Sequence, residues 1–194
     1  MGAISFKRSS LENYNKYNSL LVGNEFTPPP VDSSYDLLET TTLASSASSV
    51  TFSGLGSYTD YKHLQVRYLS RTNDIYDTFG IYLNSTNAVR GHELRGTGSS
   101  VTSSARTNSR ITENAKNSDP ANAFAAGIID ILDFSDTSKN TTIRAISGDG
   151  IDKVELGSAL YNFTAAITEI KFDIDVGSGS FVTGSRFSLF GVKG

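Results

Sequence analysis

Two histidines, His63 and His92, are the only imidazoles in the chain and its first candidates for acid–base chemistry. A serine hydrolase would need one of them as the base that activates a serine. His63 stands on the polar side of the alternating segment YKHLQVRYLSR, which indicates a solvated residue. His92, in RGHELRGTG, lies near a predicted loop without a matched nucleophile, and the sequence contains no Gly-x-Ser-x-Gly turn. We therefore predict no catalytic residue and no enzymatic activity.

The carboxylates offer two further kinds of chemistry. Asp173 and Asp175 share one face of a predicted strand, and a pair of acids can hydrolyse glycosides, but Lys171 alternates with them and the chain has no tryptophan to stack on a sugar. Between Asp130 and Asp136, three aspartates are separated by apolar residues, which is not the spacing of a calcium loop. The glycine-rich runs GSGSFVTGS and RGTGSSV lack the lysine of a phosphate loop, and no cysteine is present. We expect no metal and no cofactor.

Charge and hydropathy exclude two classes of partner. The formal net charge is −3, and 17 basic residues are scattered among 20 acidic ones, so no basic stripe is available to follow nucleic-acid phosphates. No stretch approaches the roughly 20 apolar residues of a membrane-spanning helix, and the N-terminus has no apolar secretory run. We predict a protein made in the cytosol that binds neither nucleic acid nor membrane.

The elements that must position any site are predicted strands. The chain is rich in serine, threonine and glycine, and short segments with period-2 alternation follow one another between turn clusters. FAAGIIDILDF is interpreted as a buried strand, and the polar stretch from Gly96 to Pro120 is predicted to contain a long surface loop. Eight or nine strands over residues 34–194 predict an all-β fold, an antiparallel jelly-roll-like β-sandwich. The nine predicted segments are YDLLETTTL, SVTFSGL, YKHLQVRYLSR, FGIYLN, FAAGIIDILDF, TTIRAIS, VELGSALYNF, ITEIKFDIDV and SRFSLFGVK.

Residues 1–33 differ from the rest and are predicted to form an extended N-terminal attachment arm. They show little periodicity, and three consecutive prolines, Pro28, Pro29 and Pro30, favour a stiff polyproline II spacer. Apolar and aromatic side chains in an arm need a covering surface, and the alternative is a terminus folded along its own domain. The residues predicted to contact a partner, together with the prolines, are Tyr14, Tyr17, Leu20, Leu21, Val22 and Phe26.

Several long phrases of the sequence resemble small virion structural proteins of tailed bacteriophages, particularly phages of marine bacteria and cyanobacteria. They are SLLVGNEFTPPPVDSSYDLLETTTLASSASSVTFSGLGSYTDYKHLQVRYLSRTN, HELRGTGSSV, FAAGIIDILDFSDTSKNTTIRAISGD and AAITEIKFDIDVGSGSFVTGSRFSLFGVKG. The resemblance covers most of the chain, and its motifs are strand and turn phrases rather than chemical signatures. It implies a β-rich module that carries an N-terminal attachment segment, and it supplies no catalytic residue.

Three functions follow as expectations from the resemblance and from the residues. The first is an accessory head protein, a capsid decoration or cement protein bound to the major capsid protein. The second is a tail, collar or fibre component in contact with other tail proteins and with the host surface. The third is a carbohydrate-binding sandwich with Tyr76 and Tyr82 as platforms. For the virion roles we expect a homo-oligomer that is assembled in the host cytoplasm and located in the virion.

Overall fold

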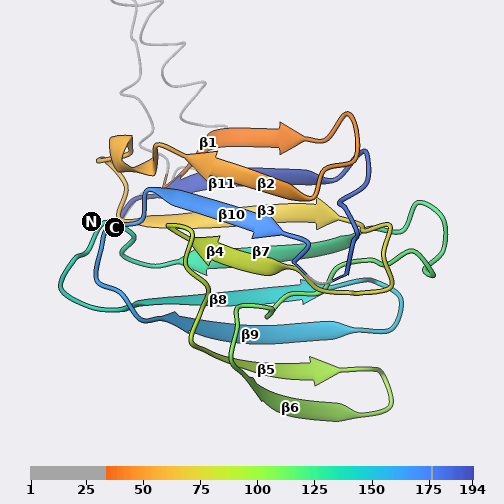
Figure 1. Ribbon diagram of the computed structural model, residues 1–194. Coiled ribbons are helices and arrows are strands. Elements are labelled where there is room, and N and C mark those ends of the chain that lie inside the picture. Colours follow the sequence, from red (N-terminus) through yellow and green to blue (C-terminus); the bar gives the residue numbers. More distant parts are fainter. Residues whose placement is uncertain (1–33, 176) are drawn as a thin grey trace, which may run out of the picture. The chain divides into compact units, whose positions relative to one another are not determined.

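The structure is a computed structural model that describes residues 34–175 and 177–194. The predicted arm, residues 1–33 with all of its proposed contact residues, lies outside the described part of the chain. The described residues form two antiparallel sheets and contain no α-helix, which confirms the all-β prediction and is consistent with a β-sandwich (Figure 1). One short 3₁₀ turn, η1 (Leu55–Ser57), follows the second strand.

The large sheet has eight strands, and its neighbours are mostly distant in sequence. In spatial order they are β1 (Tyr35–Thr42), β11 (Arg186–Val192), β3 (His63–Ser70), β7 (Ala125–Ile131), β8 (Thr141–Gly148), β9 (Val154–Tyr161), β5 (Arg90–Gly96) and β6 (Val101–Arg106). The small sheet has the order β2 (Ser49–Ser53), β10 (Glu169–Asp173) and β4 (Gly80–Leu83). The small sheet covers one face of the large sheet (Figure 1).

The core lies between the two sheets and is built mainly from aromatic and branched side chains. Phe172 of β10 stacks on Phe187 of β11 with ring centroids 5.0 Å apart, so the two sheets meet through aromatic contact. Phe79 packs edge-on against both rings at 5.8 and 6.1 Å. All three side chains are fully buried, and burial of large apolar side chains is the main stabilising contribution to such a fold.

The nine predicted strand segments all contain observed strands, but the polar stretch from Gly96 to Pro120, which was predicted to contain a long surface loop, is mainly strand and buried chain. It contains β6, and residues 109–115 run through the interior, where Ile111 and Glu113 are fully buried. The described part of the chain has eleven strands, whereas the sequence predicted eight or nine; the strands that the prediction missed are β5 and β6. Their sequences, RGHELRG and VTSSAR, have few apolar residues, and both strands depend on pairing with neighbours rather than on a strong hydrophobic pattern.

Candidate functional site: an apolar band on the large sheet

The face of the large sheet that points away from the small sheet carries a continuous row of apolar side chains. Ile128 of β7 lies opposite Ile146 of β8, which lies opposite Leu156 of β9, which lies opposite Leu94 of β5. Directly opposed side chains in an antiparallel sheet are about 4.5–5.5 Å apart at Cβ and contact one another. The four strands therefore present a single apolar row that crosses their boundaries.

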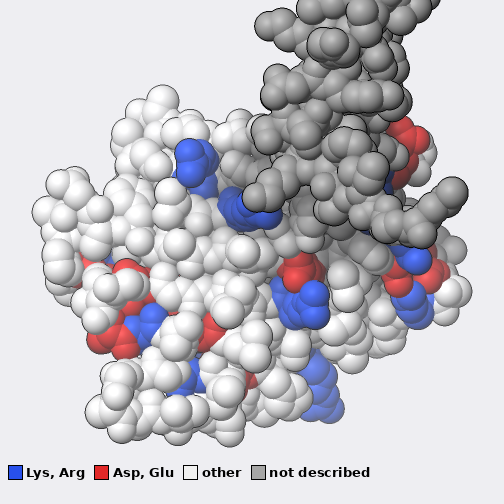
Figure 2. Space-filling model, turned by 180° about the vertical axis from the view of Figure 1, so that it is seen from behind, with Lys and Arg blue, Asp and Glu red and all other residues white. Residues whose placement is uncertain are grey.

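A second row, one pleat further along the strands, widens this surface. It begins with Leu69 of β3 and continues with Val154 of β9 and Val101 of β6. We call the two rows together the apolar band, which consists of Leu69, Leu94, Val101, Ile128, Ile146, Val154 and Leu156. Between 36% and 70% of each of these residues is exposed. Figure 2, which views the molecule from this side, shows a broad area without charged side chains.

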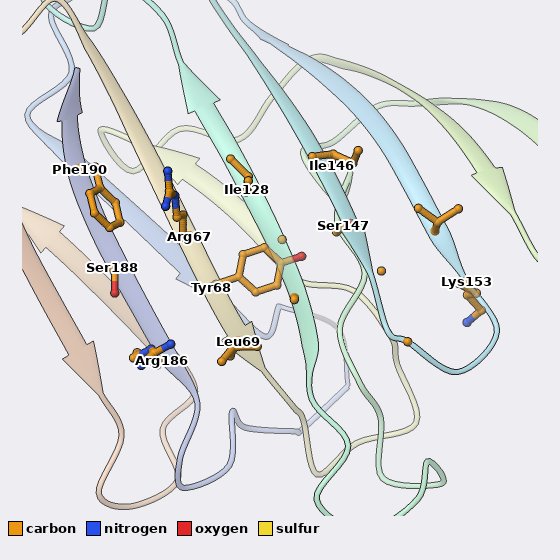
Figure 3. A pocket seen from close by; sticks show the side chains of 15 residues that line it. Arg67, Tyr68, Leu69, Ile128, Ile146, Ser147, Lys153, Arg186, Ser188 and Phe190 are labelled. Carbon is orange, nitrogen blue, oxygen red and sulfur yellow. The ribbon is translucent and has the colours of Figure 1, made fainter. Parts of the chain in front are cut away.

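Small residues in the second row make the band concave. Ala126 of β7 and Gly148 of β8 lie side by side beneath the larger neighbours, and they form the floor of an open hollow of about 790 Å³. Leu69, Ile128 and Ile146 line the hollow, as the close-up in Figure 3 shows. It is thus a shallow apolar depression on a sheet face rather than an enclosed ligand cavity.

A row of polar side chains borders the band next to the first apolar row, on the side away from the second. The guanidinium of Arg67 donates to Gln65 Oε1 at 2.9 Å, and Gln65 Nε2 donates to Asp130 Oδ1 at 2.8 Å. Arg144 Nε donates to the second carboxylate oxygen of Asp130 at 2.9 Å, and the Arg67 guanidinium also lies 4.8 Å from the ring of Phe190. An apolar centre beside an organised polar rim is the usual composition of a protein interface.

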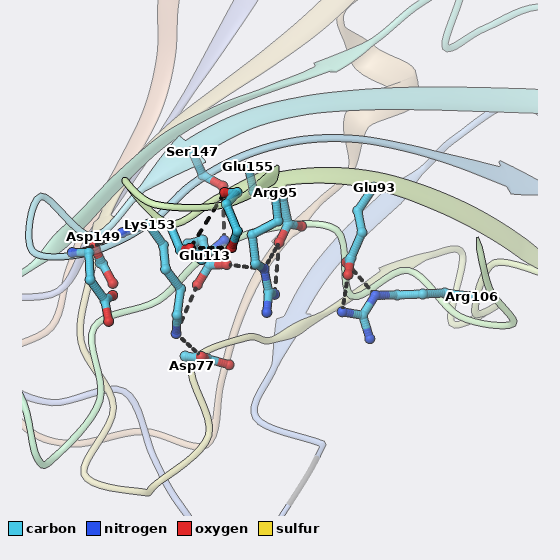
Figure 4. Close-up of polar contacts among 12 residues, drawn as sticks. Asp77, Glu93, Arg95, Arg106, Glu113, Ser147, Asp149, Lys153 and Glu155 are labelled. Carbon is cyan, nitrogen blue, oxygen red and sulfur yellow. Dashed lines mark hydrogen bonds and ion pairs between the residues drawn. The ribbon is translucent and has the colours of Figure 1, made fainter. Parts of the chain in front are cut away.

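A cluster of ionisable side chains lies on the opposite, inner side of the same strands (Figure 4). Arg95 of β5 pairs with Glu113 and with Glu155 of β9, both at 2.9 Å. Lys153 pairs with Asp77 and lies 4.0 Å from Glu113. The backbone N–H of Glu113 donates to the Ser147 hydroxyl at 2.9 Å, so the cluster fixes the interior segment 109–115 against β5, β8 and β9.

The two glutamates of this cluster are neighbouring buried acids, and the pKa of each is raised. Burial, reinforced by the neighbouring Glu155 carboxyl, raises the pKa of Glu113 to about 8 against the opposing effect of the Arg95 guanidinium. Burial also raises the pKa of Glu155. The Glu113 side chain is fully buried and that of Glu155 is 1% exposed, so a substrate has no access to this pair. Its chemistry is that of a buried acid in the core.

The histidines take structural positions in the observed fold. The backbone N–H of Asp133 donates to His63 Nδ1 at 2.9 Å, so His63 is partly buried and hydrogen-bonded, which the interpretation as a solvated residue did not foresee. His92 is exposed in the middle of β5 rather than near a loop, on the same face as the band and opposite Ser158. Strand geometry holds this imidazole next to a serine, but no activating acid is hydrogen-bonded to it among the described residues.

The carboxylates considered for glycoside or calcium chemistry are engaged in pairs. Asp173 binds Lys171 at 2.6 Å, and Asp175 accepts hydrogen bonds from the Tyr82 hydroxyl at 2.6 Å and from Arg110 at 2.9 Å. Lys171 lies 4.8 Å from the Tyr82 ring centroid, so one face of this predicted sugar platform carries a cation, while Tyr76 is 41% exposed. Among residues 34–175 and 177–194, no three His, Cys, Asp or Glu side chains are placed to hold a metal.

Sequence reasoning missed the band, although a signal was present. FAAGIIDILDF was interpreted as a wholly buried strand, whereas Ile129 and Ile131 face the core and Ile128 faces outward. Ile146 and Leu156 likewise fall at the positions of their strands that face away from the small sheet. Large apolar residues at both phases of a period-2 strand indicate two apolar faces. The acid pair gave no such signal, because its glutamates come from separate segments.

Comparison of the chain with protein-family models, with curated proteins and with solved structures gave no match. Within the described part of the chain, no helix has the length and apolarity needed to span a membrane.

Proposed function

We propose that the protein is a non-enzymatic structural component of a bacteriophage virion, an accessory head protein that decorates or cements the major capsid protein. The jelly-roll-like character of the sandwich and the attachment role of residues 1–33 belong to the same proposal. Its support is the resemblance of the sequence phrases and one structural observation, the apolar band on the outer face of the large sheet. The protein is then assembled in the host cytoplasm and located in the virion.

The band supports attachment because contact of its apolar side chains with water is unfavourable. Burial of apolar surface contributes about 25 cal/mol per Å², and monomeric soluble proteins rarely expose contiguous apolar patches above a few hundred Å². Ile146 and Leu156, at the centre of the row, are 52% and 53% exposed. Central, half-exposed aliphatic side chains with a polar rim are well placed to become fully buried against a partner.

The shape and chemistry of the band favour a protein partner over a small ligand. Sugar sites use exposed aromatic rings with convergent polar groups, whereas the band consists of Leu, Ile and Val on an open sheet face. A broad, shallow apolar surface matches a flat protein face such as that of a capsid lattice. Copy number separates the head role from the tail, collar or fibre alternative, since a decoration protein is present in hundreds of copies and a tail component in a few to a few tens.

The experiment compares incorporation into particles that lack the native protein. Ile146→Thr and Leu156→Thr replace half-exposed apolar side chains with threonine, which is β-branched and compatible with a strand. Folding should therefore be retained, while incorporation falls at least about tenfold. Ser158→Thr, on β9 and on the same face outside the band, is the matched control and should incorporate normally. Normal incorporation of both band variants, with unchanged melting temperature, would overturn the proposal.

A further inference from the structure

Among residues 34–175 and 177–194, strand β6 forms a free edge of the large sheet (Figure 1). It pairs with β5 through residues 101–106, and every residue from Val101 to Ala105 is exposed. An edge strand displays a row of backbone N–H and C=O groups that can pair with another strand. β6 therefore offers a template for strand addition along its length.

Nothing in β6 blocks such pairing, in contrast to the other edge. The segment Val101–Ala105 reads VTSSA, which contains no proline and no charge, and its register with β5 has no bulge. The edge strand β1 carries Asp36 and Glu39, and its register shifts between Leu37 and Glu39. Charges and bulges are the usual means of protecting a sheet edge, so β1 is protected and β6 is open.

The hairpin that leads into β6 defines which of its backbone groups point outward. The N–H of Thr97 donates to the carbonyl of Ser100 at 2.9 Å, so Ser100 faces β5. Hydrogen-bonding direction alternates along an antiparallel strand. Counting from Ser100, the N–H and C=O groups of Val101, Ser103 and Ala105 point away from β5 toward the free edge.

We propose that β6 pairs antiparallel with β6 of a second copy of this chain, about a two-fold axis at Ser103. Ser103 then lies opposite its own copy, and Val101 lies opposite the second copy's Ala105. All three residues have outward backbone groups, so they can exchange hydrogen bonds directly. Their side chains share the outer face of the sheet in both copies, which preserves the alternation across the junction.

The same register contains no charge conflict. Arg106, the one charged residue of β6, falls opposite the second copy's Ser100, and it remains paired with Glu93 of its own chain. The exposed edge of β6 is therefore complementary to its own copy in hydrogen bonds, in side-chain size and in charge, which is the requirement of a two-fold interface. The register also uses the whole of the exposed strand.

The dimer also brings two apolar bands together for attachment, and this consequence rests on the proposed function. A two-fold axis perpendicular to the sheet places the apolar bands of both copies on the same side of one continuous sheet. Both bands can then contact the same partner surface, and linked contacts bind more tightly than either contact alone. Dimerisation itself is measured on the purified protein, so its failure and the failure of virion attachment are separate results.

The test is sedimentation velocity of the full chain over a wide concentration range, with variants at Ser103. The wild-type protein should show a concentration-dependent dimer. Ser103→Lys places two like charges opposite each other at the axis and should raise the dissociation constant at least about tenfold, whereas Ser103→Thr should retain the dimer. At concentrations where the compared proteins are all monomeric, melting temperatures should stay unchanged, because Ser103 is exposed and its outward backbone groups are not bonded to β5.

Cysteine substitution provides a second readout that is specific to the register, since the chain has no cysteine. Directly opposed residues of a hydrogen-bonded pair have Cα atoms about 5.5 Å apart, within disulfide range, so Ser103→Cys should form a covalent dimer under mild oxidation. Ser158→Cys, on the same face but on β9, is the control and should remain monomeric under these conditions. A monomeric wild-type protein, a dimer that persists in Ser103→Lys, or equal crosslinking at both positions would each overturn the proposal.

Discussion

Glu113→Gln tests whether the buried carboxyl of Glu113 holds a proton in the folded protein at neutral pH. Burial raises its pKa from 4.5 to about 8, with Arg95 acting against the shift and Glu155 reinforcing it. Glutamine keeps the size of the side chain and an oxygen that can face Arg95 Nε, which lies 2.9 Å from Glu113 Oε1 in the wild-type protein. The variant therefore removes the titration with little change in side-chain volume.

The sign and size of the effect follow from proton linkage. Between pH 4.5 and about 8 the folded protein keeps the Glu113 proton that the unfolded chain has lost. The free energy of unfolding of the wild-type protein therefore falls as pH rises through this window, by about 1.4 kcal/mol per pH unit from this group. Above the upper value both states are ionised and the slope ends. The contribution across the whole window is on the order of 5 kcal/mol, and Glu113→Gln lacks it.

Urea unfolding at intervals from about pH 5 to about pH 9 measures this difference. The stability of Glu113→Gln relative to wild type should rise by on the order of 4 kcal/mol over that range. Glu39→Gln, which removes one carboxylate from the exposed edge strand β1, is the control for loss of charge and should follow the wild-type profile. Parallel profiles for wild type and Glu113→Gln would refute the assignment of a bound proton to this carboxyl.

Three other substitutions test the packing, each by urea or thermal unfolding. Gly157→Ala would place a Cβ 2.6 Å from Ile111 Cβ and 2.7 Å from the Ile111 backbone oxygen, so it should lower stability by about 1–3 kcal/mol. Its control, Gly96→Ala, meets a side-chain carbon at 3.4 Å and should change stability by less than about 0.5 kcal/mol. Equal effects of the two substitutions would contradict the packing around Gly157. Tyr161→Phe removes a buried hydroxyl that donates to a β4 carbonyl at 2.7 Å and should cost about 1–3 kcal/mol, and a neutral result would mean that this hydrogen bond is not formed. Phe187→Ala empties a fully buried position that contacts four other aromatic rings and should cost about 3–5 kcal/mol, so a loss below about 1 kcal/mol would argue against the central aromatic cluster.

Strand alternation was the part of the fold that sequence could predict. Leu64, Val66 and Tyr68 alternate with polar residues in β3, within the segment YKHLQVRYLSR predicted as a strand, and all three are buried. The same holds for Ile170 and Phe172 of β10. The physical reason is local, because successive side chains of any extended strand point to opposite faces and one face of each strand packs in the core.

The turns were also predictable from local chemistry. The glycine-rich run RGTGSSV, whose composition is typical of a turn, contains the hairpin turn between β5 and β6, where Gly98 has a φ of +80°. Residues with side chains rarely adopt that backbone conformation, so glycine at this position reports the turn directly. The attachment role of residues 1–33 stays a prediction, since those residues lie outside the described part of the chain.

Cross-strand register, in contrast, was decided only by the tertiary structure, and the candidate surfaces depend on it. Ile128, Ile146, Leu156 and Leu94 come from four separate segments, and they form one row only because β7, β8, β9 and β5 are neighbours in that order. Glu113 belongs to a polar stretch of the sequence, and only the structure buries it among distant strands, with its carboxyl 2.9 Å from Arg95 Nε of β5 and its backbone N–H donating to Ser147 of β8. Period-2 alternation assigns side chains to a face of their own strand, whereas the identity of each neighbouring strand is set by packing of the whole chain.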